Sequence, residues 1–572
     1  MKSEIQNSKS KIRVRLLTSA PTAHAFVLCL LFASGCSDTI PTGSLVLTQT
    51  PAHTQQTHPG SDVLDQRYPA GSRLILAVPP FKPGSIRVLS QGLVAAGSPL
   101  VCLSGRRVCF VGKSAPDAPW QIYEADLRGG SPRAVTSIEG GAMDPAMISA
   151  SEWVFSSPVP KAGQTWNAQN PPALYVQSGG QSPRRLTFGT TAAVQPTVLR
   201  DGKILFVSSH PSEGAATAPN LGLFTMNRDG TELALFALDR DGAPLVYRPR
   251  ELADGRVAFL ASSCLAGEAE ERPESVRMAR PFRSRSPLFL FPTPRCRSVE
   301  SDGEGGLLAC FERGSESGGT SVLLHPGPLP LGEGERSALS RTAQRERFDQ
   351  AQDQLLPLPA GEGRGEGERA GLQRAVQRGG STAGSFAVYR VDASDGALRE
   401  PILDDPAWHD IEAAPLIPRT PPSGHMSTVA LNKSTGTILC LNANFTRQSE
   451  TNGTSQPNAA RIRVLAASTQ RQQTVLGEVP LHSDGSFLVE VPADTPLGFE
   501  LLDKGGNVLK KLPPSIWVRP GENRSCLGCH EPPNRSPRNA RPIAANFPPA
   551  VLNSGLETLA QHSPSRSGGS AK

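Results

Sequence analysis

The chain is poor in aromatic residues and has no long hydrophobic run. Phe, Trp and Tyr together make up 5% of its 572 residues. No apolar stretch reaches the ~18 residues that a membrane-spanning helix requires, which excludes a multi-span membrane protein. Neither sign of charge dominates, because 58 Lys and Arg stand against 52 Asp and Glu and the net charge is only +6. Without a basic stripe interleaved with aromatic residues, we expect no nucleic-acid partner.

Glycine and proline, in contrast, are abundant. The chain contains 55 Gly and 53 Pro, well above the combined content of roughly 12% that is usual in proteins. Such a composition favours many short strands joined by turns over long helices. We therefore expect an all-β protein.

The N-terminal segment has the order of an export signal. Basic residues lie between Lys2 and Arg15, an apolar stretch follows over residues 25–32, and the small residues 33–35 precede Cys36. This end resembles a bacterial lipobox, although Ala33 stands where Leu is usual. The resemblance implies that residues 1–36 are a signal peptide and that a lipid on Cys36 anchors the protein to a membrane. The alternatives are a plain cleaved signal and an N-terminal anchor in which Cys36 has no role. All of these place the mature protein in the periplasm or cell envelope.

A strand-like phrase recurs through residues 70–418 and predicts a β-propeller. Its copies occupy residues 105–111, 152–156, 201–207, 254–260 and 305–311. Their phenylalanines are about 45 to 53 residues apart, an interval typical of propeller blades. Asp-Gly pairs that favour tight turns and short Arg-Leu-Thr strands follow in the same units. With these features the repeat resembles TolB-like and WD40-like propellers. We expect about six blades; a large β-sandwich is the alternative.

Residues 325–380 interrupt this pattern. They are rich in Gly, Glu and Arg and contain one aromatic residue, Phe348. Such a segment cannot bury enough apolar surface to offset the entropy lost on ordering, so we expect a disordered insertion.

A second domain is expected over residues 423–545, after the proline-rich linker 418–422. Its short alternating segments and the turn pairs at 484–485 and 505–506 predict a small antiparallel β-sandwich. Residues 546–572 are expected to be a disordered tail.

The run Cys526-Leu527-Gly528-Cys529-His530 has the C-x-x-C-H spacing of c-type haem attachment. Two thiols at this spacing can each form a thioether with one vinyl group of the same porphyrin, and the adjacent imidazole can ligate the iron. We therefore expect one covalent haem c on Cys526 and Cys529, with His530 as axial ligand and Gly528 leaving room for the ring. A redox dithiol and a zinc site are the rivals; zinc lacks an evident fourth ligand nearby.

Residues 476–480, 484–496 and 517–531 resemble the middle domain of hydrazine synthase alpha subunits. That family also places a propeller before this domain, so the resemblance covers most of residues 70–545. It implies a c-type haem docked between sandwich and propeller. The family's tyrosine ligand after the haem motif has no counterpart, because no Tyr follows Tyr389. The resemblance therefore does not imply hydrazine synthesis, and His530 remains the expected iron ligand.

The sixth iron position stays open from the sequence. The candidates are His482, His409, His425, Met426 and His210. A closed site would favour electron transfer to a redox partner protein or small molecule, with the propeller as docking scaffold. The alternatives are a haem enzyme acting on a small nitrogen compound and a TolB-like binding module.

Outside the motif, Cys102 and Cys109 lie near a predicted hairpin. They can form a disulfide in an oxidising compartment or pack as free, buried thiols.

Overall fold

The structure of the chain is a computed structural model. It describes residues 40–52, 63–157, 171–210, 220–237, 245–262, 275–279, 288–292, 296–313, 385–391, 398–445, 458–467, 472–529 and 540–552. The predicted signal peptide with Cys36, the predicted insertion 325–380 and His530, the predicted axial ligand, lie outside these residues. Within them, no helix has the length and apolar character needed to cross a membrane.

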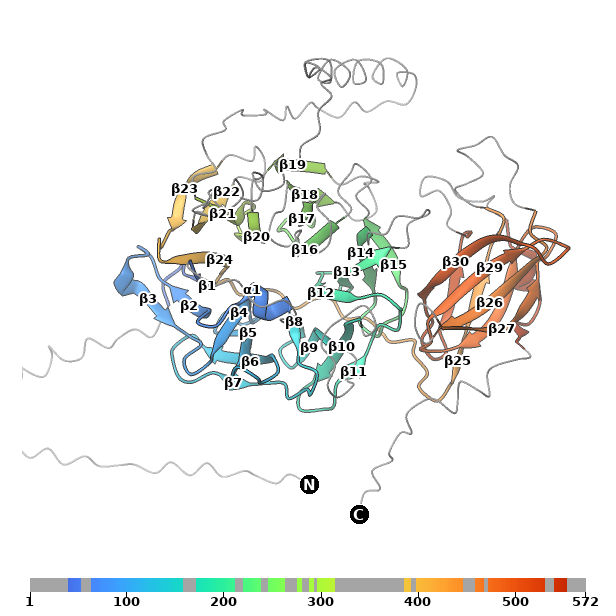
Figure 1. Cartoon of the computed structure of the whole chain (residues 1–572), viewed down its shortest axis with the longest axis horizontal. Coiled ribbons are helices and arrows are strands. Elements are labelled where there is room, and N and C mark those ends of the chain that lie inside the picture. The colour runs from blue at the N-terminus through green and yellow to red at the C-terminus, as the bar shows by residue number, and fades with distance from the viewer. Residues whose placement is uncertain are drawn as a thin grey trace, which may run out of the picture. The chain divides into compact units, whose positions relative to one another are not determined.

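Six four-stranded sheets lie between residues 45 and 415 of the described chain, and Figure 1 shows them following one another around a centre. The first sheet has the order β24-β1-β2-β3 and consists of Trp408–Pro415 (β24), Leu45–Pro51 (β1), Arg73–Ala77 (β2) and Ile86–Val88 (β3). A short helix, α1 (Val63–Arg67), precedes β2, and a 3-10 turn, η1 (Pro83–Ser85), precedes β3. The propeller predicted from the sequence is confirmed.

The other five sheets follow in chain order, and within each sheet every strand pairs antiparallel with the next. Their strands are β4 (Ala95–Val101), β5 (Arg107–Lys113), β6 (Gln121–Asp126), β7 (Arg133–Ala134); β8 (Met143–Ser149), β9 (Glu152–Ser157), β10 (Ala173–Ser178), β11 (Arg184–Arg185); β12 (Ala193–Val198), β13 (Ile204–His210), β14 (Asn220–Met226), β15 (Ala234–Ala237); β16 (Leu245–Glu251), β17 (Val257–Ser262), β18 (Ser275–Ala279), β19 (Leu288–Pro292); β20 (Cys296–Ser301), β21 (Leu307–Glu312), β22 (Phe386–Val391) and β23 (Leu398–Leu403).

The recurring phenylalanine explains why the sequence period is visible. It lies in the second strand of each repeat, and Phe110, Phe155 and Phe206 are at most 1% exposed. Each packs on an aromatic ring of the next strand, at centroid distances of 6.0, 6.2 and 6.0 Å. Cross-strand aromatic pairs of this kind stabilise a sheet beyond the apolar area that they bury.

The first sheet starts earlier than residue 70, where the sequence pattern begins. Strand β1 pairs antiparallel both with β2 and with β24, the last strand of the ring. Inside this sheet, the buried Gln49 donates from Nε2 to Asp410 Oδ1 at 2.8 Å. The ring is thus closed by pairing of its first and last strands, and β1 carries no copy of the phenylalanine phrase that would reveal it.

Two more four-stranded sheets form the β-sandwich that follows the propeller. Their orders are β31-β25-β28-β32 and β27-β26-β29-β30. The strands are β25 (Thr435–Cys440), β26 (Arg461–Ala467), β27 (Gln473–Pro480), β28 (Phe487–Pro492), β29 (Leu497–Leu502), β30 (Val508–Ile516), β31 (Asn523–Cys526) and β32 (Ala550–Val551). A single apolar core lies between the sheets, with Ile438, Ile462, Val489 and Leu501 at most 1% exposed.

Two edges of the sandwich differ from the prediction. β31 and β32 join their sheet in parallel, beside β25 and β28 respectively. The predicted tail from residue 546 is wrong for its first residues, since Ala550 pairs with Val489 and Leu552 is only 3% exposed in the core. The edge strand β32 consists of only two apolar residues, Ala550 and Val551, and follows the 3-10 turn η3 (Ile543–Asn546). Residues beyond 552 lie outside the described chain.

Candidate haem-attachment site

The C-x-x-C loop is fixed to the sandwich by its backbone. Cys526 ends β31 and pairs in parallel register with Cys440 of β25. Leu441 N donates to Cys526 O at 2.9 Å, and Cys529 N donates to Phe445 O at 3.2 Å. The segment after β25 therefore holds the loop that carries both thiols.

Gly528 is required by this close approach of two backbones. A Cβ on residue 528 would lie 2.3 Å from Phe445 O, a distance that no side chain tolerates. The sequence suggested that this glycine leaves room for a porphyrin. In the structure its space is used by the carbonyl of Phe445.

A third thiol lies beside the pair. Cys440 is 1% exposed and Cys529 is 5% exposed, and both belong to the sandwich core, while Cys526 is partly exposed. The hydrogen bond between Cys440 and Cys529, together with burial, raises the pKa of the Cys440 thiol well above its ordinary value. Sequence reasoning missed Cys440, because only the pairing of β25 with β31 brings it to the motif.

The three thiols bear on which group the loop can hold. The spacing of Cys526 and Cys529 fits two thioethers, and Cys526 is reachable, whereas the Cys529 sulfur would have to leave Cys440 to join a porphyrin edge. Cys440 is also the extra sulfur ligand that a zinc site seemed to lack. Among the described residues, however, the one group of three metal-type donors whose atoms lie within 4.8 Å of one another is Cys102, Cys109 and Glu124. The described part of the loop therefore supplies the two sulfurs that haem attachment needs, with a third thiol beside them.

Among the candidates for the sixth iron position, His482 begins a tight turn, since Gly485 N donates to His482 O at 2.8 Å. Its turn is joined to the segment after β25, because Ala443 N donates to Gly485 O at 2.8 Å. The His482 ring stacks on Phe547 at a centroid distance of 5.0 Å.

The other candidates are not brought to the loop by any contact in the described chain. His409 belongs to β24, where its Nδ1 accepts a hydrogen bond from Phe386 N at 3.3 Å. His425 is exposed and Met426 is 87% exposed, and both lie in the segment between β24 and β25. The side chain of His210 lies outside the described part.

The sandwich contacts the propeller through the segment that leads into the motif. Trp517 is 4% exposed and belongs to an apolar cluster with Phe206 and Met226 of the propeller. Its Nε1 donates to Gly230 O at 3.3 Å, and Glu232 N donates to Glu522 Oε1 at 3.0 Å.

A polar ring inside the propeller was not foreseen from the sequence. Five residues at bulges of innermost strands have left-handed backbone, with φ from 50° to 58°: Ser98, Asp144, Gln195, Arg248 and Glu412. They are linked in sequence around the ring, since Gln195 N donates to Asp144 Oδ2 at 3.3 Å and Arg248 N donates to Gln195 Oε1 at 2.6 Å. Their residue types differ from blade to blade, so no repeated letter marks the positions.

Glu412 is the most heavily bonded member of this ring. Its carboxylate forms an ion pair with Arg248 and accepts hydrogen bonds from Tyr68 Oη at 2.6 Å and from Ser98 N at 2.8 Å. Burial alone would raise the pKa of Glu412, but Arg248, Tyr68 and Arg67 outweigh it and lower the pKa to about 2.

Together these features define an all-β class in which a propeller precedes a small sandwich carrying a C-x-x-C loop. Residues 437–531 match the family described as hydrazine synthase alpha subunit middle domain. The chain is similar in fold to Kuenenia stuttgartiensis hydrazine synthase, at 16% identity and a TM-score of 0.64, over 88% of this chain and 72% of that one. The resemblance to that middle domain, indicated by the sequence motifs, is confirmed.

Propeller proteins are also among the similar structures. TolB from Acinetobacter baumannii matches at 15% identity and a TM-score of 0.34, over 48% of this chain and 59% of that one. TolB from Agrobacterium tumefaciens matches at 15% identity and a TM-score of 0.31, over 44% and 90%. No protein of curated function matches the chain in sequence.

Proposed function

We propose that the chain is an exported c-type haem protein that transfers electrons, with haem attached through Cys526 and Cys529 and ligated by His530. The observation that supports this most directly is the C-x-x-C-H run at the end of the segment that matches the hydrazine synthase alpha subunit middle domain. In this proposal the export signal delivers the chain to the periplasm, a lipid on Cys36 anchors it, and the propeller docks a redox partner.

The chain's own residues have defined tasks in this proposal. The backbone hydrogen bonds from Leu441 and to Phe445 hold the loop whose two sulfurs, Cys526 and Cys529, would carry the haem. The bound group supplies reversible one-electron chemistry at iron. His482, whose ring is oriented by Phe547, is the side chain we assign to the sixth position.

Covalent attachment is tested with the full chain matured in a host that ligates haem to exported proteins. Intact mass should rise by one haem, and reduced-minus-oxidised absorbance should show c-type bands. Cys526→Ala and Cys529→Ala should each lose a thioether, whereas the neighbouring Cys440→Ser should retain both. A wild-type chain that carries no haem and instead contains one zinc, lost in Cys440→Ser, would refute the proposal.

The same material distinguishes electron transfer from small-ligand chemistry. We expect a low-spin spectrum that carbon monoxide does not change, and His482→Ala should become high-spin and bind carbon monoxide. A wild-type spectrum that is already high-spin and shifts with nitric oxide would refute electron transfer and favour a haem enzyme.

A further inference from the structure

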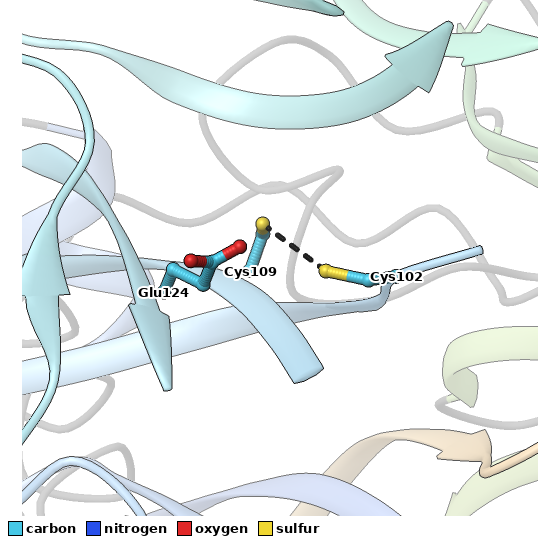
Figure 2. A group of neighbouring side chains, drawn as sticks. All are labelled: Cys102, Cys109 and Glu124. Carbon is cyan, nitrogen blue, oxygen red and sulfur yellow. Dashed lines mark hydrogen bonds between the residues drawn. The ribbon is translucent and has the colours of Figure 1, made fainter. Parts of the chain in front are cut away.

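A buried pair of thiols lies at the hairpin that joins β4 and β5. Cys102 follows β4 and Cys109 lies within β5, and the two residues are 2% and 0% exposed. Their Sγ atoms are 3.5 Å apart, and Figure 2 shows the two side chains pointing toward one another. The hairpin holds them there, since Cys102 N donates to Arg107 O at 2.9 Å. A bonded pair of sulfurs is about 2.05 Å apart, so forming a disulfide brings the two Sγ atoms about 1.5 Å closer together.

The surroundings favour thiol chemistry over cation binding. Glu124 of β6 places a carboxylate oxygen within 4.8 Å of both sulfurs (Figure 2). Its Oε2 already accepts from Arg107 at 2.9 Å and from Arg133 at 3.3 Å. A divalent cation would therefore meet two guanidinium groups, whereas a thiolate is stabilised by positive charge.

The two thiols differ in acidity. The hydrogen bond from Cys109 lowers the pKa of Cys102, and the guanidinium groups of Arg107 and Arg419 act in the same direction. The same bond, with burial, raises the pKa of Cys109. Cys102 is therefore the thiol that ionises first, and its hairpin ends in the exposed residues Ser104 and Arg106.

The hairpin also carries the linker that leaves the propeller. Arg419 N donates to Leu103 O at 3.0 Å, and the Arg419 guanidinium donates to Val101 O. At Gly105, an added Cβ would lie 3.2 Å from Pro418. The conformation of residues 102–109 therefore determines the surface on which the linker rests.

We propose that Cys102 and Cys109 form a reversible disulfide, made by exchange with a low-molecular-weight disulfide, that locks the hairpin beneath the linker. The Cys102 thiolate attacks one sulfur of the small disulfide, which forms a mixed disulfide and releases one thiolate that takes up the proton lost by Cys102. Cys109 then attacks Cys102 Sγ and loses its proton. The mixed disulfide breaks, and the second small thiolate leaves and takes up that proton. Two protein thiols are oxidised and one small disulfide is reduced to two thiols.

The experiment uses the full chain, incubated with oxidised glutathione or with dithiothreitol, alkylated and digested with trypsin. Trypsin cleaves at Arg106 and Arg107, between the two cysteines, so the disulfide joins peptides 88–106 and 108–113. We expect this linked pair after glutathione and its loss after dithiothreitol. Two alkylated peptides under both conditions would overturn the proposal, whatever the variants do.

Two variants test the order of attack. Cys109→Ser should accumulate one glutathione on Cys102, because the second step cannot occur, whereas Cys102→Ser should leave Cys109 free of glutathione. Cys296→Ser, at another buried propeller thiol, is the matched control and should form the linked pair as wild type does. Glutathione on Cys109 in Cys102→Ser, with none on Cys102 in Cys109→Ser, would overturn the assigned roles.

Discussion

Replacing Glu412 with Gln should destabilise the propeller by about 3 to 5 kcal/mol at pH 7. The side chain is 7% exposed, and its partner Arg248 is 15% exposed. The pKa of Glu412 is lowered from 4.5 to about 2. At about 1.4 kcal/mol per pKa unit this corresponds to about 3 kcal/mol, and breaking a buried ion pair typically costs about 3–5 kcal/mol because the remaining charge is left unpaired.

The pH dependence has a definite sign. A folded-state pKa below the unfolded value stabilises the protein above pH 4.5, and this contribution is lost as the pH falls from 4.5 toward 2. The difference in free energy of unfolding between wild type and Glu412→Gln should therefore shrink over that window. We expect no such dependence between pH 6 and pH 8.

Urea unfolding followed by circular dichroism and tryptophan fluorescence measures this effect. Glu304→Gln is the control, since the Glu304 side chain is 77% exposed and should change stability by less than about 0.5 kcal/mol. The double variant Arg248→Met/Glu412→Gln should recover part of the loss, because it removes one unpaired charge. A loss below about 1 kcal/mol for Glu412→Gln, or no recovery in the double variant, would refute the reasoning.

Three further changes test other parts of the structure. Burial raises the pKa of Asp410 from 3.8 to about 7 despite hydrogen bonds from Gln49 and Asp405. As the pH rises from 4 to 7, the free energy of unfolding of wild type should therefore fall by up to about 4 kcal/mol relative to that of Asp410→Asn. Urea unfolding at each pH measures this, and a constant difference between the two proteins would contradict it. Gly528→Ala should destabilise the sandwich by about 1–3 kcal/mol, because the added Cβ would clash with Phe445 O. Gly84→Ala, with open space around it, is the control and should not change stability. Equal unfolding midpoints for the two variants would show that the loop accommodates the added Cβ without loss of stability. Phe206→Ala should cost about 3–5 kcal/mol, since it empties a site 1% exposed beside Phe224, and thermal unfolding would detect it; an unchanged melting temperature would argue against the packing.

The sequence predicted the propeller where its signal is local and repeated. Phe110, Phe155 and Phe206 recur because each blade needs the same buried ring in its second strand. Strand β1 was missed, because it pairs with β24 across the length of the ring and has no copy of that residue.

At the candidate site, the spacing of Cys526 and Cys529 in the sequence predicted the thiol pair, but nothing in the sequence predicted that Cys440 lies beside it. The contact of Cys440 with Cys529 depends on the parallel register of β25 and β31, which no local pattern encodes. The sequence did not predict the polar ring around Glu412 either. Its bulges require a left-handed backbone conformation, and Ser98, Gln195 and Arg248 adopt that conformation with different side chains, so no common residue type marks the positions.

The pairing of β1 with β24 has a consequence for how the chain folds. Residues 45–51 emerge early during synthesis, but one of their two partner strands, residues 408–415, follows only after the whole ring has been made. Until then one edge of β1 offers open hydrogen-bonding groups to any strand that it meets. Contacts this distant in sequence form slowly, so a newly made chain keeps this edge of β1 open to aggregation until β24 completes the first sheet.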